Sequence, residues 1–244
     1  MAVGTGFGQE PLHVEEMTAD QPFCAGVILL LGERILVTLN DDGLPPERTG
    51  CAYRVGGVGG GQEPGETILQ CALREAREET CGDVELLPSP VTYVHDMDTD
   101  DGRRMQTADV LSPYLLQRVT NRTPHTPYKP GLPTGPYVYF GVYLARMSTW
   151  ETLAPGDDVR GLLAISLADW ELLERGVSVQ ELEASDTLVW KGPELRSDFR
   201  LWLPERESYR VAVKLLLDED ISMDGRSSED QGLHPIHAGS DMGK

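Results

Sequence analysis

Three glutamates, Glu75, Glu78 and Glu79, stand close together in the stretch CALREAREET. On a helix that turns by about 100° per residue, they fall on one face. Glu75 and Glu79 are one turn apart, where like charges repel, and no lysine follows either of them at the spacing that would relieve this repulsion. A divalent cation would neutralise such a cluster, because hard cations prefer oxygen ligands and bridge carboxylates to phosphates. The alternative is an acidic helix face covered only by solvent.

The segment before these glutamates is rich in glycine, with the sequence GGGQEPGET from residue 59 to residue 67. Glycines let the backbone turn tightly and approach a ligand closely, and the start of a helix favours an anion. Two common phosphate-binding motifs do not fit. Gly65-Glu66-Thr67 lacks the lysine of a Walker A loop, and a GxGxxG motif counted from Gly59 would need a glycine at Pro64.

At these residues the sequence resembles the Nudix hydrolase family. The family signature is Gly, five residues, Glu, seven residues, and then Arg-Glu-aliphatic-x-Glu-Glu-x-Gly-aliphatic. The charged and first glycine positions all match in spacing, as Gly60, Glu66, Arg74, Glu75, Glu78 and Glu79. We call residues 59–82 the box segment.

Three positions of the box segment depart from the signature. Ala76 replaces a bulky aliphatic residue, Cys81 stands where the signature has glycine, and Gly82 takes the place of the closing aliphatic residue. These changes affect packing and the end of the helix, where glycine is favoured for its left-handed conformation. They leave the charged positions intact.

The resemblance implies that the three glutamates hold Mg²⁺ or Mn²⁺, together with the main-chain carbonyl of Gly60. It gives Arg74 the role of orienting Glu66 or Glu78 through charge-assisted hydrogen bonds. The implied reaction is hydrolysis of a pyrophosphate linkage, in which a water activated by the cation attacks phosphorus. One carboxylate must accept the proton of that water. The resemblance leaves open whether this is Glu75 or an acid on a later loop.

Two further groups are candidates for the site. Asp158, or its neighbour Asp157, lies in a phrase that looks like the family's late acidic loop, so it is a candidate metal ligand or base. An exposed turn acid is the alternative. Arg103 and Arg104 begin the proline-rich segment 102–136, which is locally basic, and we expect them to bind the phosphate or sugar of the substrate from a lid. The alternatives for this segment are a contact in a homodimer and a disordered insert.

Short apolar runs predict the elements that position these residues. Strands rich in β-branched and aromatic residues are expected at 24–31, 34–39, 52–58, 84–87, 91–95, 137–146 and 159–166. Besides the helix of the box segment, helices are expected at 167–174 and 206–218. The resemblance implies an α/β fold, a three-layer α/β/α Nudix sandwich with a mixed sheet and an inserted lid-like segment.

The expected organisation is a loose arm over residues 1–20, a Nudix domain over 21–217 with an insert at 98–136, and a disordered acidic tail over 218–244. An acidic run begins at Asp96 and ends at Gly102. It fails as a calcium-binding EF-hand loop, because its glycine is one place late and Thr107 stands at position twelve. We expect a solvated turn there.

Composition limits the classes of partner. The formal net charge is −19, which argues against nucleic acid, since a basic face is the usual footprint for it. No run reaches the roughly 20 apolar residues that a membrane helix needs. The four cysteines lack paired CxxC spacing, which is typical of reduced thiols in a cytoplasmic protein.

We therefore predict a metal-dependent hydrolase that cleaves the pyrophosphate linkage of a nucleoside diphosphate joined to another group, as in ADP-ribose or a nucleotide sugar. Its expected partner is a small-molecule nucleotide substrate, and we expect it to bind neither nucleic acid nor a membrane. The alternative from another class is a Nudix fold kept as a nucleotide-binding or regulatory module without turnover. Loss of a signature glutamate would favour that alternative, and all of them are present.

Overall fold

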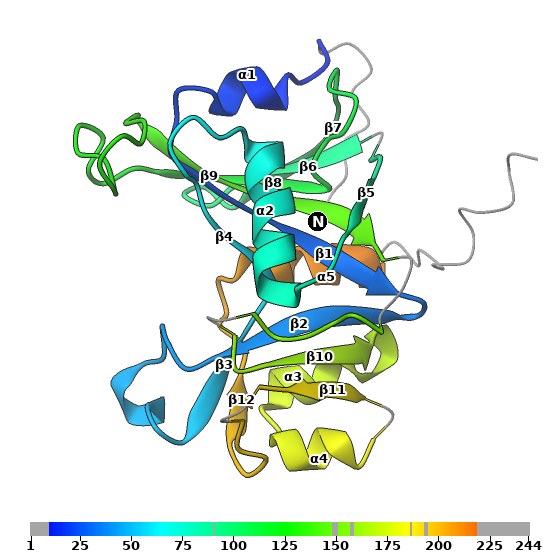
Figure 1. Ribbon diagram of the computed structural model, residues 1–244. Coiled ribbons are helices and arrows are strands. Elements are labelled where there is room, and N and C mark those ends of the chain that lie inside the picture. The colour runs from blue at the N-terminus through cyan, green and yellow to red at the C-terminus, as the bar shows by residue number, and fades with distance from the viewer. Residues whose placement is uncertain are drawn as a thin grey trace, which may run out of the picture.

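The computed structural model describes residues 10–89, 91–147, 151–156, 159–185, 187–192 and 195–218 (Figure 1). In these ranges the strands are β1 Phe23–Leu31, β2 Arg34–Asn40, β3 Ala52–Gly56, β4 Val58–Gly61, β5 Glu85–Leu87, β6 Val91–Asp96, β7 Asp101–Gln106, β8 Leu115–Thr120, β9 Tyr137–Arg146, β10 Gly161–Ser166, β11 Leu188–Lys191 and β12 Arg200–Trp202. The helices are α1 Val14–Thr18, α2 Ile68–Thr80, α3 Trp170–Arg175, α4 Val179–Glu183 and α5 Ser208–Asp218, with 3₁₀ turns at Pro46–Arg48 and Leu167–Asp169.

One mixed sheet joins these strands. Its main path runs in the order β11-β10-β2-β1-β9-β8-β6-β7, and β3, β4, β5 and β12 pair with other strands off this path. The central pair is β1 and β9, which run parallel over residues 23–30 and 139–146. β4 also pairs with β1, antiparallel, and this contact sets Ala25 opposite Gly60 and Gly26 opposite Gly59. The sheet therefore places the start of the box segment directly against its central strand.

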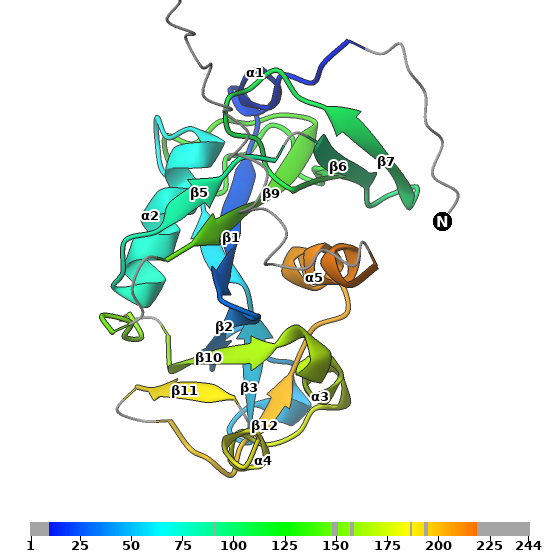
Figure 2. The ribbon, with the colours of Figure 1, turned by 90° about the vertical axis from the view of Figure 1, so that its right-hand side faces the viewer.

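Helices cover both faces of the sheet, as the edge view shows (Figure 2). Side chains alternate along β1, so that Val27 and Leu29 pack in a core with α1 and α2, while Ile28 packs in a second core with α3, α4 and α5. The predicted three-layer α/β/α arrangement is confirmed, and α2 and α5 lie on opposite sides of β1.

The strand predicted at 52–58 is two strands that join different neighbours. β3 pairs with β2, and β4 pairs with β1. The chain changes partner at Gly57, where a Cβ atom would collide with the ring of Tyr209. Glycine therefore lets α5 close over the break, and the apolar pattern alone does not show it. The strand predicted at 137–146 has the predicted bounds.

Residues 98–136 are less of an insert than predicted. β7 and β8 lie in this segment, and both belong to the sheet. β7 escaped prediction because its sequence, DGRRMQ, is polar and almost fully exposed, as an edge strand with one neighbour can be. Residues 121–136 contain no helix or strand, so the lid prediction now concerns only them.

The predicted N-terminal arm is ordered where the structure describes it. Val14 is buried at the start of α1, and its main-chain N–H donates to Asp109 Oδ2 at 2.7 Å. The expectation of a loose arm is therefore wrong for residues 10–20, while residues 1–9 and the predicted tail after 218 lie outside the described residues. None of the helices described is long and apolar enough to cross a membrane.

The acidic run from Asp96 to Gly102 forms the turn between β6 and β7. It is not a purely solvated loop, because two of its carboxylates bind β8. Asp96 Oδ2 accepts a hydrogen bond from Arg118 Nε at 2.8 Å, and Asp98 Oδ2 accepts one from the main-chain N–H of Thr120 at 2.7 Å. These bonds fix the hairpin, and they account for acids that could otherwise suggest a cation site.

Candidate active site on helix α2 and the adjoining cavity

Helix α2 begins at a capping box. The Thr67 hydroxyl accepts from the main-chain N–H of Gln70 at 3.2 Å, and Gln70 Oε1 accepts from the N–H of Thr67 at 2.9 Å. Both bonds satisfy main-chain donors that the first helical turn leaves unpaired. The helix ends at Cys81, whose φ of 53° lies in the left-handed region. Cysteine therefore takes the conformation for which the family signature has glycine.

The buried stripe of α2 differs slightly from the one that helical periodicity predicts, which is Leu69, Ala72, Leu73, Ala76 and Thr80. Ala72, Ala76 and Thr80 are buried as predicted, whereas Leu69 and Leu73 are only half-buried. Ile68 and Cys71 are buried in their place, so the buried residues of α2 are Ile68, Cys71, Ala72, Ala76 and Thr80. Ile68 gains its room from Gly141 on β9, since a Cβ there would lie 2.7 Å from Ile68 Cδ1. A glycine that is far away in the sequence therefore helps to decide which residues of α2 are buried.

Arg74 neutralises most of the carboxylates around it. Its Nε donates to Glu66 Oε1 at 2.9 Å, and its Nη1 donates to Glu75 Oε1 at 2.7 Å and to Glu78 Oε2 at 2.9 Å. Its Nη2 also donates to the carbonyl oxygen of Gly61 at 2.8 Å. Helical spacing alone predicts a cationic neighbour only for Glu78, with Arg74 one turn before it, and the structure shows that this is too narrow. One guanidinium, with its planar fork of donors, serves three carboxylates.

Glu79 and Glu75 also hold α2 against the glycines of β4. Glu79 Oε2 accepts from the main-chain N–H of Gly59 at 2.8 Å. The carboxyl group of Glu75 lies so close to Gly60 that a Cβ atom on Gly60 would be 2.5 Å from it. A side chain at Gly60 would therefore displace Glu75, which gives a local reason for glycine at this position.

Burial and Arg74 move the carboxyl pKa values in opposite directions. Burial raises the pKa of Glu75 above its usual value, and the hydrogen bond from Arg74 offsets this only in part. Burial also acts against ionisation of Glu66, but there the hydrogen bonds from Arg74 and from the N–H of Glu63 prevail and lower the pKa. The cluster therefore holds one acid that ionises easily beside one that binds protons more tightly.

The donor set suits a hard cation. Carboxylate oxygens of Glu75, Glu78 and Glu79 and the carbonyl oxygen of Gly60 are ligands of the kind that Mg²⁺ and Mn²⁺ take. Within the described ranges, however, no three acidic, histidine or cysteine side chains converge as a group that could hold a metal ion. Arg74 occupies oxygens of two of the glutamates, and Glu79 is directed to Gly59.

Asp158 and Asp157 lie outside the described residues. The segment just before them is bound to the end of α2. Gly156 N–H donates to the carbonyl oxygen of Glu79 at 2.9 Å, and Ala154 N–H donates to that of Thr80 at 3.1 Å. A Cβ atom on Gly156 would collide with the main chain of Glu78. The late loop therefore reaches the helix that carries the glutamates.

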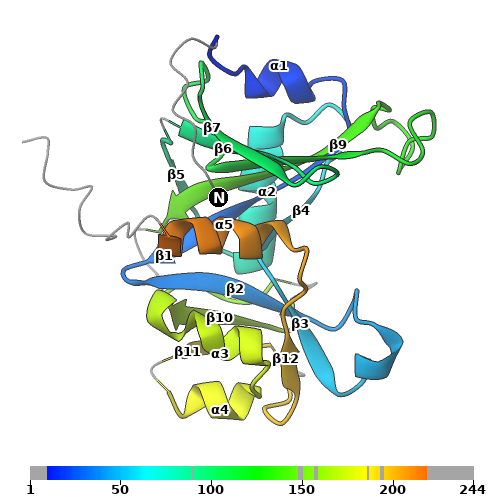
Figure 3. The same cartoon turned by 180° about the vertical axis from the view of Figure 1, so that it is seen from behind.

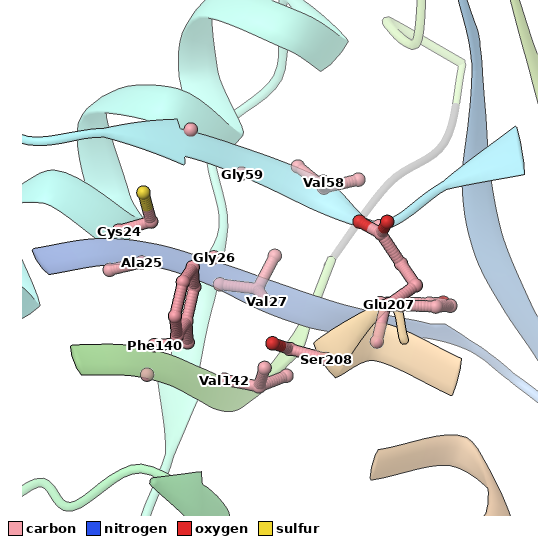
Figure 4. A pocket seen from close by; sticks show the side chains of 14 residues that line it. Cys24, Ala25, Gly26, Val27, Val58, Gly59, Phe140, Val142, Glu207 and Ser208 are labelled. Carbon is pink, nitrogen blue, oxygen red and sulfur yellow. The ribbon is translucent and has the colours of Figure 1, made fainter. Parts of the chain in front are cut away.

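A cavity of about 230 Å³ adjoins the same glycines, between the start of α5 and strands β1, β4 and β9. Figure 4 shows Phe140 beside Gly26 on one side of this cavity and the carboxylate of Glu207 beside Val58 on the other. Its lining is otherwise largely glycine and apolar side chains. Because Gly59 and Gly60 line the cavity and also contact Glu79 and Glu75, the carboxylate cluster and the cavity share one wall.

Arg103 and Arg104 do not reach this place. Both are on β7, the edge strand, and β6, β8 and β9 lie between it and β1. Arg103 lines a different cavity of about 440 Å³, shared with Leu12 and Tyr139. The guanidinium of Arg104 lies 5.1 Å from the ring centroid of Tyr93. Their predicted contact with substrate phosphate stays a prediction, and it would require the substrate to extend beyond the cavity described here.

The residues that line the cavity were not predicted from the sequence. Cys24, Phe140 and Glu207 come from parts of the chain far apart, and nothing in their local patterns distinguishes them from ordinary strand or loop residues. One usable signal was available for Glu207, which is an acid directly before an amphipathic helix.

Comparison with known proteins identifies the domain. Residues 21–132 of this mixed α/β chain, which include the carboxylate helix, match the model of the NUDIX domain family. The chain therefore contains a Nudix domain, the domain of the Nudix hydrolases. No curated protein matches the chain.

Several solved structures are similar at low identity. A Nudix hydrolase from Clostridium perfringens is 18% identical, with 62% of this chain and 84% of that chain covered and a TM-score of 0.38. An ADP-ribose pyrophosphatase from Streptococcus suis is 16% identical, with 61% and 75% covered and a TM-score of 0.34. A Nitrosomonas europaea Nudix hydrolase is 14% identical at a TM-score of 0.34, with 60% of this chain covered, and the match spans 58% of its length. At these values the identification depends on the domain match.

Proposed function

We propose that this chain is a metal-dependent pyrophosphohydrolase that cleaves the diphosphate linkage of a nucleoside diphosphate joined to another group. The shared wall of Gly59 and Gly60 carries the proposal. It sets the carboxylates of Glu75 and Glu79 on one side of two glycines and a cavity with apolar walls on the other, so a nucleoside in the cavity would lie close to the carboxylates. The NUDIX domain match supports the reaction class.

Glu75, Glu78, Glu79 and the Gly60 carbonyl would hold Mg²⁺ or Mn²⁺, with Asp158 as a further ligand. When bound, the cation supplies charge neutralisation for the phosphate oxygens and lowers the pKa of water. Holding it requires the carboxylates to exchange bonds, because Arg74 now binds two of them. Glu66 would keep Arg74 in place during that exchange, through its own hydrogen bonds to Nε and Nη2.

The chain itself would supply the proton acceptor and a cavity that shields the nucleoside. Glu75 is a candidate base, because its carboxyl group lies against Gly60, which lines the cavity. Asp158 is the other candidate. The apolar walls of the cavity, among them Val58 and Phe140, would exclude water from the nucleoside.

A module that binds a nucleotide without turnover is the second candidate. The observation that favours it is that the acids in the described part of the chain form no three-membered group ready for a metal. The two candidates give opposite results with the same substrates.

The test is a panel of nucleoside diphosphate conjugates with Mg²⁺ or Mn²⁺, scored for release of nucleoside monophosphate. The panel should include ADP-ribose, nucleotide sugars, dinucleoside polyphosphates and oxidised nucleotides. We expect turnover of one class, and a fall in kcat of at least about 100-fold in Glu79→Gln, since a group that stabilises developing charge contributes on that scale. Glu33→Gln removes an exposed charge in the β1–β2 turn and serves as the control.

Thermal unfolding should show that Glu79→Gln remains folded. Equal turnover in Glu79→Gln and wild type would contradict the role of the box segment. Binding of a conjugate without any hydrolysis would establish the second candidate instead.

A further inference from the structure

Glu207 is an acid directly before α5, and no hydrogen-bond donor reaches its carboxylate from the described residues. It lines the cavity beside Val58 (Figure 4). Its nearest cation is Arg54, at 3.8 Å between Nη1 and Oε1, which is too long for a hydrogen bond. Arg54 is shared with Asp42, at 3.5 Å. Across the described ranges, no N–H or O–H group is found to donate to the Glu207 carboxylate.

The electrostatics of the cavity agree with this geometry. Burial raises the pKa of Glu207, and Arg54 offsets the effect only in part. Burial also raises the pKa of Cys24, and the charges of Glu75 and Glu207 raise it further. Two carboxylates therefore act on the cavity, Glu75 from the α2 side and Glu207 from the α5 side. The first has Arg74 as its partner, whereas the second is short of donors.

The rest of the lining offers little that is polar. Val27, Val58, Phe140 and Val142 contribute apolar atoms, and glycines 26, 57, 59, 60 and 141 expose flat backbone. A flat, mostly apolar body fits such walls, because aromatic faces stack on apolar surface and on one another. The Glu207 side chain is only half-buried, so its carboxylate gains from donors on a ligand that covers it, because an acceptor left unpaired there is costly.

We propose that Glu207 is a specificity-determining residue whose carboxylate accepts two hydrogen bonds from a pair of adjacent neutral donors on the nucleoside. This inference rests on the proposed function, which places a nucleoside in the cavity. Two parts of a nucleoside present such a pair. Guanine has its ring N1–H beside its exocyclic amine, and ribose has the two hydroxyls of its cis-diol. Adenine presents a donor beside an acceptor, and the acceptor would oppose the carboxylate.

The test compares Glu207→Gln with Glu205→Gln. Both changes remove one negative charge from the same loop, and Glu205 is exposed and does not line the cavity. Glutamine keeps one acceptor and adds one donor, so it matches adenine better than guanine. The substrates are the ADP and GDP conjugates of one sugar, and the 2′,3′-dideoxy form of each.

If the guanine edge is bound, Glu207→Gln lowers kcat/KM for the GDP conjugates about 10- to 100-fold and lowers it less, or raises it, for the ADP conjugates. If the cis-diol is bound, the loss is equal for both bases and disappears with the dideoxy substrates. Either result supports the pair of donors. Equal kinetics of Glu207→Gln and Glu205→Gln on every substrate would overturn it.

Calorimetric binding of GMP and AMP, without metal, separates this inference from the proposed function. A protein that hydrolyses no conjugate, but whose affinity for GMP falls about 10-fold or more in Glu207→Gln and not in Glu205→Gln, would contradict the hydrolase and keep the inference. Hydrolysis that Glu79→Gln abolishes and Glu207→Gln leaves unchanged would do the opposite.

Discussion

Helices α2 and α5 cross opposite faces of the same central strand, and they differ in how they meet it (Figures 2 and 3). α2 buries mainly small side chains, such as Ala72 and Ala76. α5 buries larger ones, including Tyr209 and Leu216. The small residues let α2 approach β4 closely enough for its glutamates to contact the glycine backbone, whereas α5 is held by apolar bulk.

The difference extends to charge. The acids around α2 find donors within the protein, from Arg74 and from the main chain of β4. Glu207, directly before α5, has only a long ion pair among the residues that the structure describes. The comparison teaches that a dense cluster of acids can be internally satisfied, and that a single acid with few neighbours can be the one short of partners.

Removal of Arg74 should have the largest effect, because the acids around α2 would then lose the donors that Glu207 lacks. Arg74→Met leaves the carboxylates of Glu66, Glu75 and Glu78 without their shared cation, so we expect the free energy of unfolding to fall by about 2 to 3 kcal/mol. Millimolar Mg²⁺ should restore part of this loss, because a cation can replace the guanidinium. Urea unfolding with and without Mg²⁺ measures both effects.

Arg77→Met is the matched control, since Arg77 is exposed on the same helix and, within the described part of the chain, forms its ion pair with the exposed Asp83 at 3.4 Å. It should change stability by less than about 0.5 kcal/mol. Equal effects of the two variants would show that the cluster does not depend on Arg74.

Tyr209→Phe tests the apolar attachment of α5. The Tyr209 hydroxyl donates to the carbonyl oxygen of Leu36 at 2.6 Å, inside the core. We expect its loss to cost about 1 to 1.5 kcal/mol in thermal or urea unfolding, because the carbonyl is left buried with one bond fewer. Tyr143→Phe changes a similarly buried ring in the core on the α2 side, and no comparable bond is found for its hydroxyl in the described structure. A larger loss for Tyr143→Phe would contradict this account.

Glu174→Gln should give the smallest effect, and one that depends on pH. Glu174 Oε1 binds Arg210 Nη2 at 2.9 Å and Lys214 Nζ at 3.2 Å, which ties α3 to α5. Burial opposes ionisation, but the two cations prevail and lower the pKa of Glu174. Its stabilisation is therefore present above the unfolded pKa and is lost as pH falls through the lower folded value.

We expect Glu174→Gln to cost about 0.5 kcal/mol at pH 7, and the difference from wild type to vanish at a pH well below the usual glutamate pKa of about 4.3. Urea unfolding across this pH range measures it. A difference that grows as the pH falls would have the wrong sign for an ion pair.

The sequence carried the parts of the site that lie close together in the chain. The helix bearing Glu75 and Glu79 could be predicted because spacing on a single helix sets its faces. The central strand at 137–146 could be predicted from its β-branched and aromatic content. Burial of Ile68 could not, because it depends on Gly141, a residue from a strand that pairs elsewhere in the fold.

The cavity could not be predicted for the same reason. Its walls come from β1, β4, β9 and the start of α5, and no local pattern marks residues that meet only after folding. The polar strand β7 was missed because an exposed edge strand needs no apolar alternation. The hypothesis for Arg103 and Arg104 followed from local positive charge, which says nothing about distance from the glutamates.

The bonds between the late loop and the end of α2 have a consequence for protein engineering. The carbonyl oxygens of Glu79 and Thr80 are satisfied by Gly156 and Ala154, which follow them by a long stretch of chain. A peptide of residues 59–82 transplanted into another scaffold would carry every signature side chain, yet it would fray at the turn that bears Glu79. The signature residues can be copied into another protein, but their geometry depends on contacts from the rest of the domain.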